Sequence, residues 1–181
     1  MKAHLPYFFA LLTLAACKGN SGEKALFTEL DSTQTAVTFR NDLPANDKLN
    51  ILEYLYYYNG GGVATGDVNN DGLPDLYFVG NRGKNKLYLN KGAFNFEDVT
   101  EKAGVGGFAD WQTGVTMADV NGDGWLDLYV CAVSNYKGLE GSNELYINNG
   151  DGTFTEKAAD CGLDFQGFST QAAFFDYDHD G

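Results

Sequence analysis

Three short segments of the chain carry oxygen-bearing side chains at alternating positions. In residues 67–75, Asp or Asn stands at positions 1, 3, 5 and 9, and Gly stands at position 6. Residues 119–127 repeat this pattern, and residues 176–181 repeat its first six positions. Alternating oxygen ligands on a loop that turns at glycine are typical of Ca²⁺ sites, because Ca²⁺ takes about six to eight oxygens in flexible geometry. Each segment therefore predicts a calcium-binding loop.

Each loop implies its own ligand set. The predicted ligands are Asp67, Asn69, Asp71, the carbonyl of Leu73 and Asp75 in the first loop, Asp119, Asn121, Asp123, the carbonyl of Trp125 and Asp127 in the second, and Asp176, Asp178 and Asp180 in the third. The alternative is that acidic, glycine-rich turns join strands without a metal. Carboxylates crowded into one short loop repel one another unless a cation neutralises them, which favours calcium, held weakly and for structure.

The elements that position these loops are predicted to be strands. The first aspartates of the loops are 52 and 57 residues apart, and the apolar segments around the first two loops also match each other. Position 12 is Phe78 in one loop and Val130 in the other, so the bidentate glutamate of an EF-hand is missing. Each unit reads as four short strands, one entering the loop, one leaving it and two more joined by a glycine-containing hairpin.

Four short strands per ~50 residues are typical of a β-propeller blade. We therefore predict an all-β fold in which residues 35–181 supply about two and a fraction blades of a propeller of roughly six to eight blades. Residues 35–58 are predicted to supply a strand that closes the ring. On this interpretation the chain is a fragment, because the third loop stops at Gly181, before position 9.

The loops and their surroundings resemble the FG-GAP/VCBS repeat family. The resemblance is carried by the aspartate loops, by Gly-Val-Ala at residues 62–64 and by Asn-Lys-Leu-Tyr-Leu-Asn at residues 85–90, and it covers about residues 35–181. Residues 59–75 resemble the first repeat of bacterial relatives of cartilage acidic protein, which often carry an ASPIC/UnbV region. The resemblance implies calcium as a blade-stabilising ion, and adhesion or ligand binding as the usual role.

The first seventeen residues have the pattern of a bacterial lipoprotein signal. Lys2 precedes a short apolar stretch that ends in Leu14-Ala-Ala-Cys17, so Cys17 is the predicted lipid-attachment residue. An ordinary secretory signal is the alternative. Residues 18–34 then read as a tether, and the protein is predicted to be exported and held at the outer membrane by its lipid. No apolar run reaches the ~20 residues of a membrane-spanning helix.

Composition narrows the range of partners. A net charge of −13 disfavours nucleic acid as a partner, because a chain with more acidic than basic residues is repelled by the phosphates. We predict a non-enzymatic calcium-binding scaffold that binds an unknown glycan or protein. The alternatives are the propeller portion of an extracytoplasmic polysaccharide-active enzyme, and a purely structural repeat. Leu52, Tyr54, Tyr56 and Tyr58 are expected to share one strand face as packing residues rather than as a ligand platform. Cys131 and Cys161 are expected to be buried thiols, with a disulfide left open.

Overall fold

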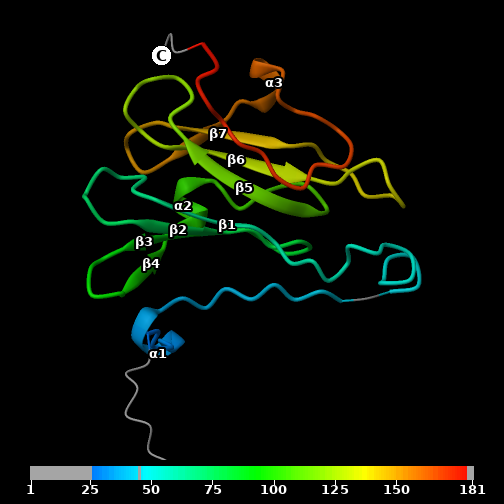
Figure 1. The fold of residues 1–181 in the computed structure, drawn as a ribbon, viewed down its shortest axis with the longest axis horizontal. Coiled ribbons are helices and arrows are strands. Elements are labelled where there is room, and N and C mark those ends of the chain that lie inside the picture. The colour runs from blue at the N-terminus through cyan, green and yellow to red at the C-terminus, as the bar shows by residue number, and fades with distance from the viewer. Residues whose placement is uncertain (1–25, 45, 179–181) are drawn as a thin grey trace, which may run out of the picture.

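The computed structural model describes residues 26–44 and 46–178. Two four-stranded antiparallel sheets account for the strands of this part of the chain (Figure 1). The first sheet contains β1 (Val63–Gly66), β2 (Asp75–Phe78), β3 (Lys86–Asn90) and β4 (Phe96–Asp98), and the second contains β5 (Gln112–Ala118), β6 (Asp127–Ala132), β7 (Glu144–Asn148) and β8 (Phe154–Glu156). In both sheets each strand pairs with the next one in the sequence. The all-β prediction, with four strands per unit, is confirmed.

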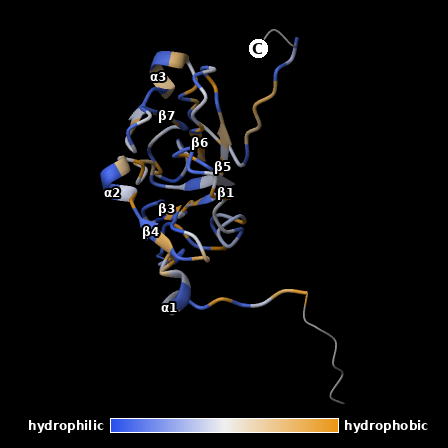
Figure 2. Cartoon of the chain, turned by 90° about the vertical axis from the view of Figure 1, so that its left-hand side faces the viewer, coloured by the Kyte–Doolittle hydropathy of each residue, from blue (hydrophilic) through white to orange (hydrophobic). Residues whose placement is uncertain are grey.

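The two sheets repeat each other residue by residue. Leu76 pairs with Tyr88 between β2 and β3, and Leu128 pairs with Tyr146 at the equivalent place. Each last strand leads into a four-residue helix, α2 (Thr100–Ala103) or α3 (Ala158–Cys161), which ends at a left-handed glycine. A side chain is disfavoured at this backbone conformation, so glycine suits the end of each helix. Figure 2 places α2 and α3 at the edge of the sheets opposite β1 and β5.

The main core lies between the two sheets. Eleven buried residues form it, seven from the first unit and four from the second: Val68, Tyr77, Val79, Leu87, Val99, Ala103, Val105, Val115, Leu128, Val130 and Tyr146. Every residue of β6 is buried, whereas β2 alternates buried and half-buried residues. β6 is thus covered on both of its faces, as expected of a strand that lies between stacked layers.

The outer faces of both sheets are covered by neighbouring parts of the chain. Phe39 stacks on Phe78 of β2 with ring centroids 5.0 Å apart, and the backbone N–H of Thr38 donates to the hydroxyl of Tyr88. On the other outer face, Phe174 packs edge-on against Tyr129 at 5.6 Å. The N-terminal segment therefore lies against the first sheet, and the C-terminal segment against the second (Figure 1).

The prediction of a strand within residues 35–58 is wrong for the residues described there. This part contains no strand; it begins with the end of α1 (Ser32–Thr35) and continues as extended chain and turns. The helix α1 begins after Asp31, whose carboxylate accepts from the backbone N–H of Thr33 and Gln34. Such a side-chain cap satisfies otherwise unpaired donors and competes with a strand.

The expectation for the tyrosine segment is also wrong. Residues 51–58 form turns, in which the backbone N–H of Tyr57 donates to the carbonyl of Tyr54. Tyr54 and Tyr57 are buried, whereas Tyr56 and Tyr58 are exposed. Turns place residues three apart on the same side, so the alternation expected of a strand does not apply.

Three further observations bear on the sequence predictions. Both described cysteines are free; Cys131 is buried as expected, but Cys161 is exposed because it lies at the end of α3. Within the described residues, no helix has the length and apolar character needed to cross a bilayer. The predicted signal, and Cys17 with it, lies outside the described residues.

Candidate metal loops

The first two aspartate loops connect equivalent strands. Residues 67–75 lead from β1 into β2, and residues 119–127 lead from β5 into β6. The two loops lie side by side at one end of the sheets, since the side-chain amide of Asn70 donates to the carbonyl of Gly124 at 3.1 Å. The strand-loop-strand setting predicted for both loops is therefore present, and helices, as in an EF-hand, do not flank them.

In the first loop, the aspartates at positions 1 and 9 hold the backbone in a closed turn. The carboxylate of Asp67 accepts from the N–H of Asp71 at 3.1 Å and from that of Gly72 at 2.7 Å. The carboxylate of Asp75 accepts from the N–H of Val68 at 3.0 Å and from that of Asn90 at 2.8 Å. Asp75 is fully buried. It therefore joins the start of the loop to the end of β3.

The second loop repeats this hydrogen bonding. Asp119 accepts from the N–H of Asp123 at 3.1 Å and from that of Gly124 at 2.8 Å. Asp127 accepts from the N–H of Val120 at 3.0 Å and from that of Asn148 at 2.8 Å. These four distances match those of the first loop closely. Both sequences thus specify one loop conformation, in which positions 1 and 9 act as acceptors.

The side chains at positions 3 and 5 also turn onto the backbone. Asn69 accepts from the N–H of Asp71 at 3.1 Å, and Asp71 accepts from the N–H of Leu73 at 2.9 Å. The equivalent bonds of Asn121 and Asp123 measure 3.0 and 2.9 Å. Gly72 and Gly124, at position 6, have φ of +85° and +86°, which glycine adopts without strain.

The pKa of the aspartate at position 9 is raised in both loops. Burial raises the pKa of Asp75, and the charges of Asp71 and Asp67 act in the same direction, against the two backbone N–H bonds. Burial raises the pKa of Asp127 in the same way. The pKa of the exposed Asp119 is lowered, chiefly by the N–H of Gly124.

Within the described structure, the aspartates of the first two loops, residues 67–75 and 119–127, form no ion pair with a cationic side chain. The ion pairs of the described structure involve other acidic residues, all outside the loops: Asp42, Glu53, Glu97, Asp98 and Asp160. Among the described residues, no three His, Cys, Asp or Glu side chains converge closely enough to hold a metal ion. The first two loops contain side-chain oxygens of the type that Ca²⁺ prefers, but in this structure these oxygens accept from backbone N–H groups instead of converging on one point.

The third predicted loop does not form a comparable turn in the described part of the chain. Asp176 and Asp178 lie in a segment without strands, and Asp180 lies outside the described residues. The strand expected before this loop, at residues 171–175, is absent as well. The preceding residues are joined to the second sheet by an isolated bridge between Val133 and Phe168 and by the N–H of Ser169, which donates to the carbonyl of Ala132 at 3.1 Å.

One residue that the sequence analysis did not single out connects the two loops. Asn148, at the end of β7, donates its side-chain amide to the carbonyl of Val68 at 2.8 Å and to that of Leu126 at 3.1 Å. It is 3% exposed. The available signal was an asparagine at the end of both Leu-Tyr segments, since Asn90 occupies the equivalent position in the first unit.

Comparison with known proteins agrees with this repeat architecture. The FG-GAP-like repeat family matches residues 67–130, a range that starts at the first aspartate of the first loop and ends within β6. Residues 67–130 are thus similar to an FG-GAP-like repeat. FG-GAP-like repeats are propeller blades, so each four-stranded sheet is one blade. The four-stranded blades expected from the sequence are confirmed for the two complete units.

Two longer proteins are similar to this chain. Cartilage acidic protein 1 of Xenopus tropicalis is 33% identical over 110 residues, which cover 61% of this chain and 17% of that protein. Cartilage acidic protein 1 of Homo sapiens is 30% identical over 129 residues, which cover 71% of this chain and 18% of that protein. The chain thus spans less than a fifth of the length of these relatives.

Proposed function

We propose that this chain is the calcium-binding propeller part of an exported, lipid-anchored scaffold that binds a glycan or protein ligand without catalysing a reaction. The two loops at residues 67–75 and 119–127 each hold one Ca²⁺. A bound Ca²⁺ would supply positive charge and would be coordinated by oxygens of the loop, which would lock the loop between two strands. The third loop, which begins at Asp176, is proposed as a further site.

One observation carries the calcium proposal: a fully buried aspartate closes each loop with no cationic side chain beside it. Asp75 is 0% exposed and Asp127 is 1% exposed. A carboxylate is rarely buried unless it is paired or bound to a metal, because the loss of hydration is costly. The carboxylates at positions 1 and 5 of the same loop add negative charge that a divalent cation would neutralise.

The scaffold role is supported by the repeat and by the N-terminal pattern. Stacked blades with short loops form a stiff body whose ends present connecting segments. Lipidation at Cys17, followed by residues 18–34 as a tether, would hold this body near the outer membrane. The net charge of −13 supports ligands other than nucleic acid.

Calorimetric titration and thermal melting, each with calcium and with chelator, test the calcium proposal on the purified protein. Asp71→Asn and Asp123→Asn each remove one position-5 carboxylate from an exposed site, so each should abolish one binding event. Asp164→Asn, an exposed residue outside the loops, is the charge-matched control and should bind like the parent. Absence of both binding heat and a calcium-dependent melting shift in the parent protein would refute the proposal.

A further inference from the structure

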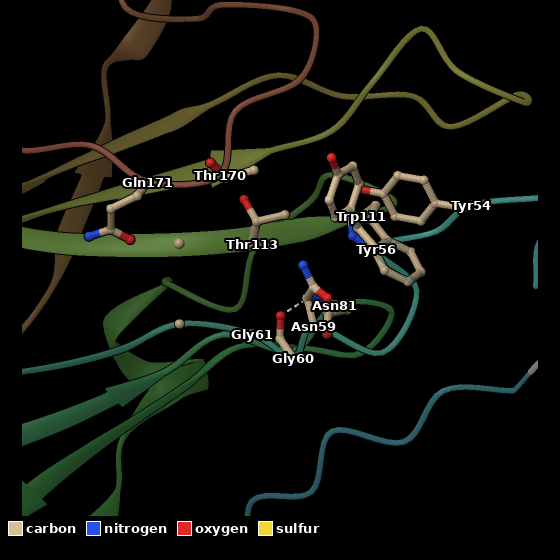
Figure 3. A pocket seen from close by; sticks show the side chains of 12 residues that line it. Tyr54, Tyr56, Asn59, Gly60, Gly61, Asn81, Trp111, Thr113, Thr170 and Gln171 are labelled. Carbon is tan, nitrogen blue, oxygen red and sulfur yellow. Dashed lines mark hydrogen bonds between the residues drawn. The ribbon is translucent and has the colours of Figure 1, made fainter. Parts of the chain in front are cut away.

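A cavity of about 230 Å³ lies at the end of the blades opposite the aspartate loops. It is bounded by Gly60–Gly62, which precede β1, and by Thr113 and Gly114 of β5. The loops follow the other ends of these two strands. Figure 3 shows the rings of Tyr54, Tyr56 and Trp111 gathered on one side of this cavity, with Thr170 and Gln171 on another.

The aromatic wall combines fixed rings with one that is accessible. Tyr54 packs edge-on against Trp111, with centroids 5.2 Å apart, and against Tyr56 at 5.8 Å. Trp111 is 1% exposed and Tyr54 is 4% exposed, whereas Tyr56 is 58% exposed. Two rings thus belong to the packed core, and the third stands at the mouth. An exposed ring held by buried rings presents an apolar face to a ligand at little cost in entropy.

Part of the backbone that lines the cavity is already hydrogen-bonded. The carbonyl of Gly60 accepts from the side-chain amide of Asn81 at 3.0 Å. The N–H of Gly62 donates to the carbonyl of Thr113, and the carbonyl of Gly62 accepts from Val79 at 2.9 Å. These bonds occupy Gly60 and Gly62 and so leave fewer backbone groups for a peptide that would add as an extra strand. The side chains of the cavity remain available for recognition.

The side chains available for recognition are polar but uncharged. Within the described structure, Tyr54, Tyr56, Asn59 and Thr170 line the cavity and have no side-chain hydrogen bond to protein. They offer three hydroxyls and one amide. No charged residue lines the cavity, although the chain as a whole carries a net charge of −13. This combination suits a neutral ligand that has several hydroxyl groups and an apolar face.

We propose that this cavity binds one neutral sugar residue of a glycan. A pyranose ring presents C–H groups that pack on the exposed face of Tyr56 and hydroxyls that bond to Asn59 and Thr170. The cavity is smaller than the ~300–1,000 Å³ of pockets for drug-sized ligands, which suits a single ring. The proposal deepens the binding role proposed above by naming the ligand class, and it requires no calcium at the cavity.

The two tryptophans allow the test to be specific, because they lie at opposite ends of the blades. Trp111 lines the cavity and Trp125 lies in the second aspartate loop. In the Trp125→Phe protein, Trp111 is the sole tryptophan reporter. Its fluorescence is titrated with glucose, galactose, mannose, fucose and N-acetylglucosamine, with glucuronate as the charged comparison. Saturation-transfer NMR with the same sugars gives a second readout.

At least one neutral sugar should give a saturable change at millimolar concentration. Tyr56→Ala should weaken binding about tenfold, which corresponds to a loss of about 1.4 kcal/mol. Tyr58→Ala is the matched control, because Tyr58 is also exposed but lies outside the cavity; it should change binding less than twofold. Saturation by no neutral sugar, or equal effects of the two variants, would overturn the proposal, as would saturable binding of an uncharged peptide instead.

The sugar-binding test and the calcium test can fail independently of each other. Sugar binding that persists in chelator, in a protein that gives no calcium heat, would support the cavity and reject the calcium sites. Calcium binding without binding of any neutral sugar would reject the cavity alone.

Discussion

Replacing Asn148 by alanine should destabilise the protein more than the same change at Asn90. The two residues occupy equivalent positions and share two kinds of bond. Each donates its side-chain amide to the carbonyl at position 8 of its own blade's loop, Leu126 or Pro74, and each accepts from a glycine N–H in the following hairpin. Asn148 alone makes a further bond, at 2.8 Å, to Val68 in the neighbouring blade.

The magnitude follows from this one extra bond. A typical hydrogen bond contributes about 0.5–1.5 kcal/mol to stability, and a buried carbonyl left unpaired costs about 1–3 kcal/mol. We expect Asn90→Ala to cost about 1–3 kcal/mol and Asn148→Ala about 1–1.5 kcal/mol more. For a chain of this size, the difference corresponds to a melting temperature about 2–6 °C lower.

Thermal and denaturant unfolding of both variants, in calcium and in chelator, measure this difference. Val68 is position 2 of the first loop, so Asn148→Ala should also weaken the proposed calcium site of the other blade. The Asp123→Asn background, which leaves the first loop intact, isolates that effect. Equal destabilisation by the two alanine variants would refute a stabilising role for the bond between blades.

Three further predictions concern the buried Glu144, the tight contact at Gly61 and the proposed lipid at Cys17. Burial raises the pKa of Glu144, so between the unfolded pKa of about 4.3 and the raised folded pKa, the folded state holds more protons than the unfolded state and its stability should fall as pH rises. Glu144→Gln should flatten this fall in melting curves recorded from pH 4 to 8. An unchanged slope in the variant would contradict the prediction. Gly61→Ala should lower the free energy of unfolding by about 1–3 kcal/mol or more in denaturant titrations, because a Cβ there would overlap the carbonyl of Val79. Gly83→Ala is the control and should be nearly neutral, since the space around Gly83 is open. Similar destabilisation by the two variants would exclude the steric reason. Cys17→Ser should abolish incorporation of labelled fatty acid and detergent-phase partitioning, and continued labelling would show that the lipid is attached elsewhere.

The sequence predicted most strongly where the repeat imposes a pattern. The eight strands and the two complete loops follow from matched residues such as Asp67 and Asp119, because equivalent residues in stacked blades have equivalent surroundings. Prediction failed where the surroundings differ. Lys86 and Glu144 occupy the same repeat position, yet Lys86 forms an ion pair with Asp98 near the surface while Glu144 is fully buried. A single sequence does not show which blade face a neighbour will cover.

The tyrosine segment failed for a different reason. Its alternating aromatic residues have the period of a strand, but local turn bonds, such as that from Tyr57 to Tyr54, prevail. The cavity lined by Tyr54 and Trp111 joins residues 57 positions apart in the sequence, so no local pattern could have indicated it. The same holds for the contact of Asn148 with Val68, which depends on how one blade lies on the next.

The pairing of strands that are neighbours in the sequence bears on how this protein would reach its native state after the proposed export. Contacts between strands close only short loops of chain, which favours rapid formation of each sheet. The segment around Phe39, which covers the first sheet, precedes that sheet in the sequence. A chain that emerges from an export channel with its N-terminus first would therefore have the cover of its first sheet already outside, and each later sheet could add to a surface already formed.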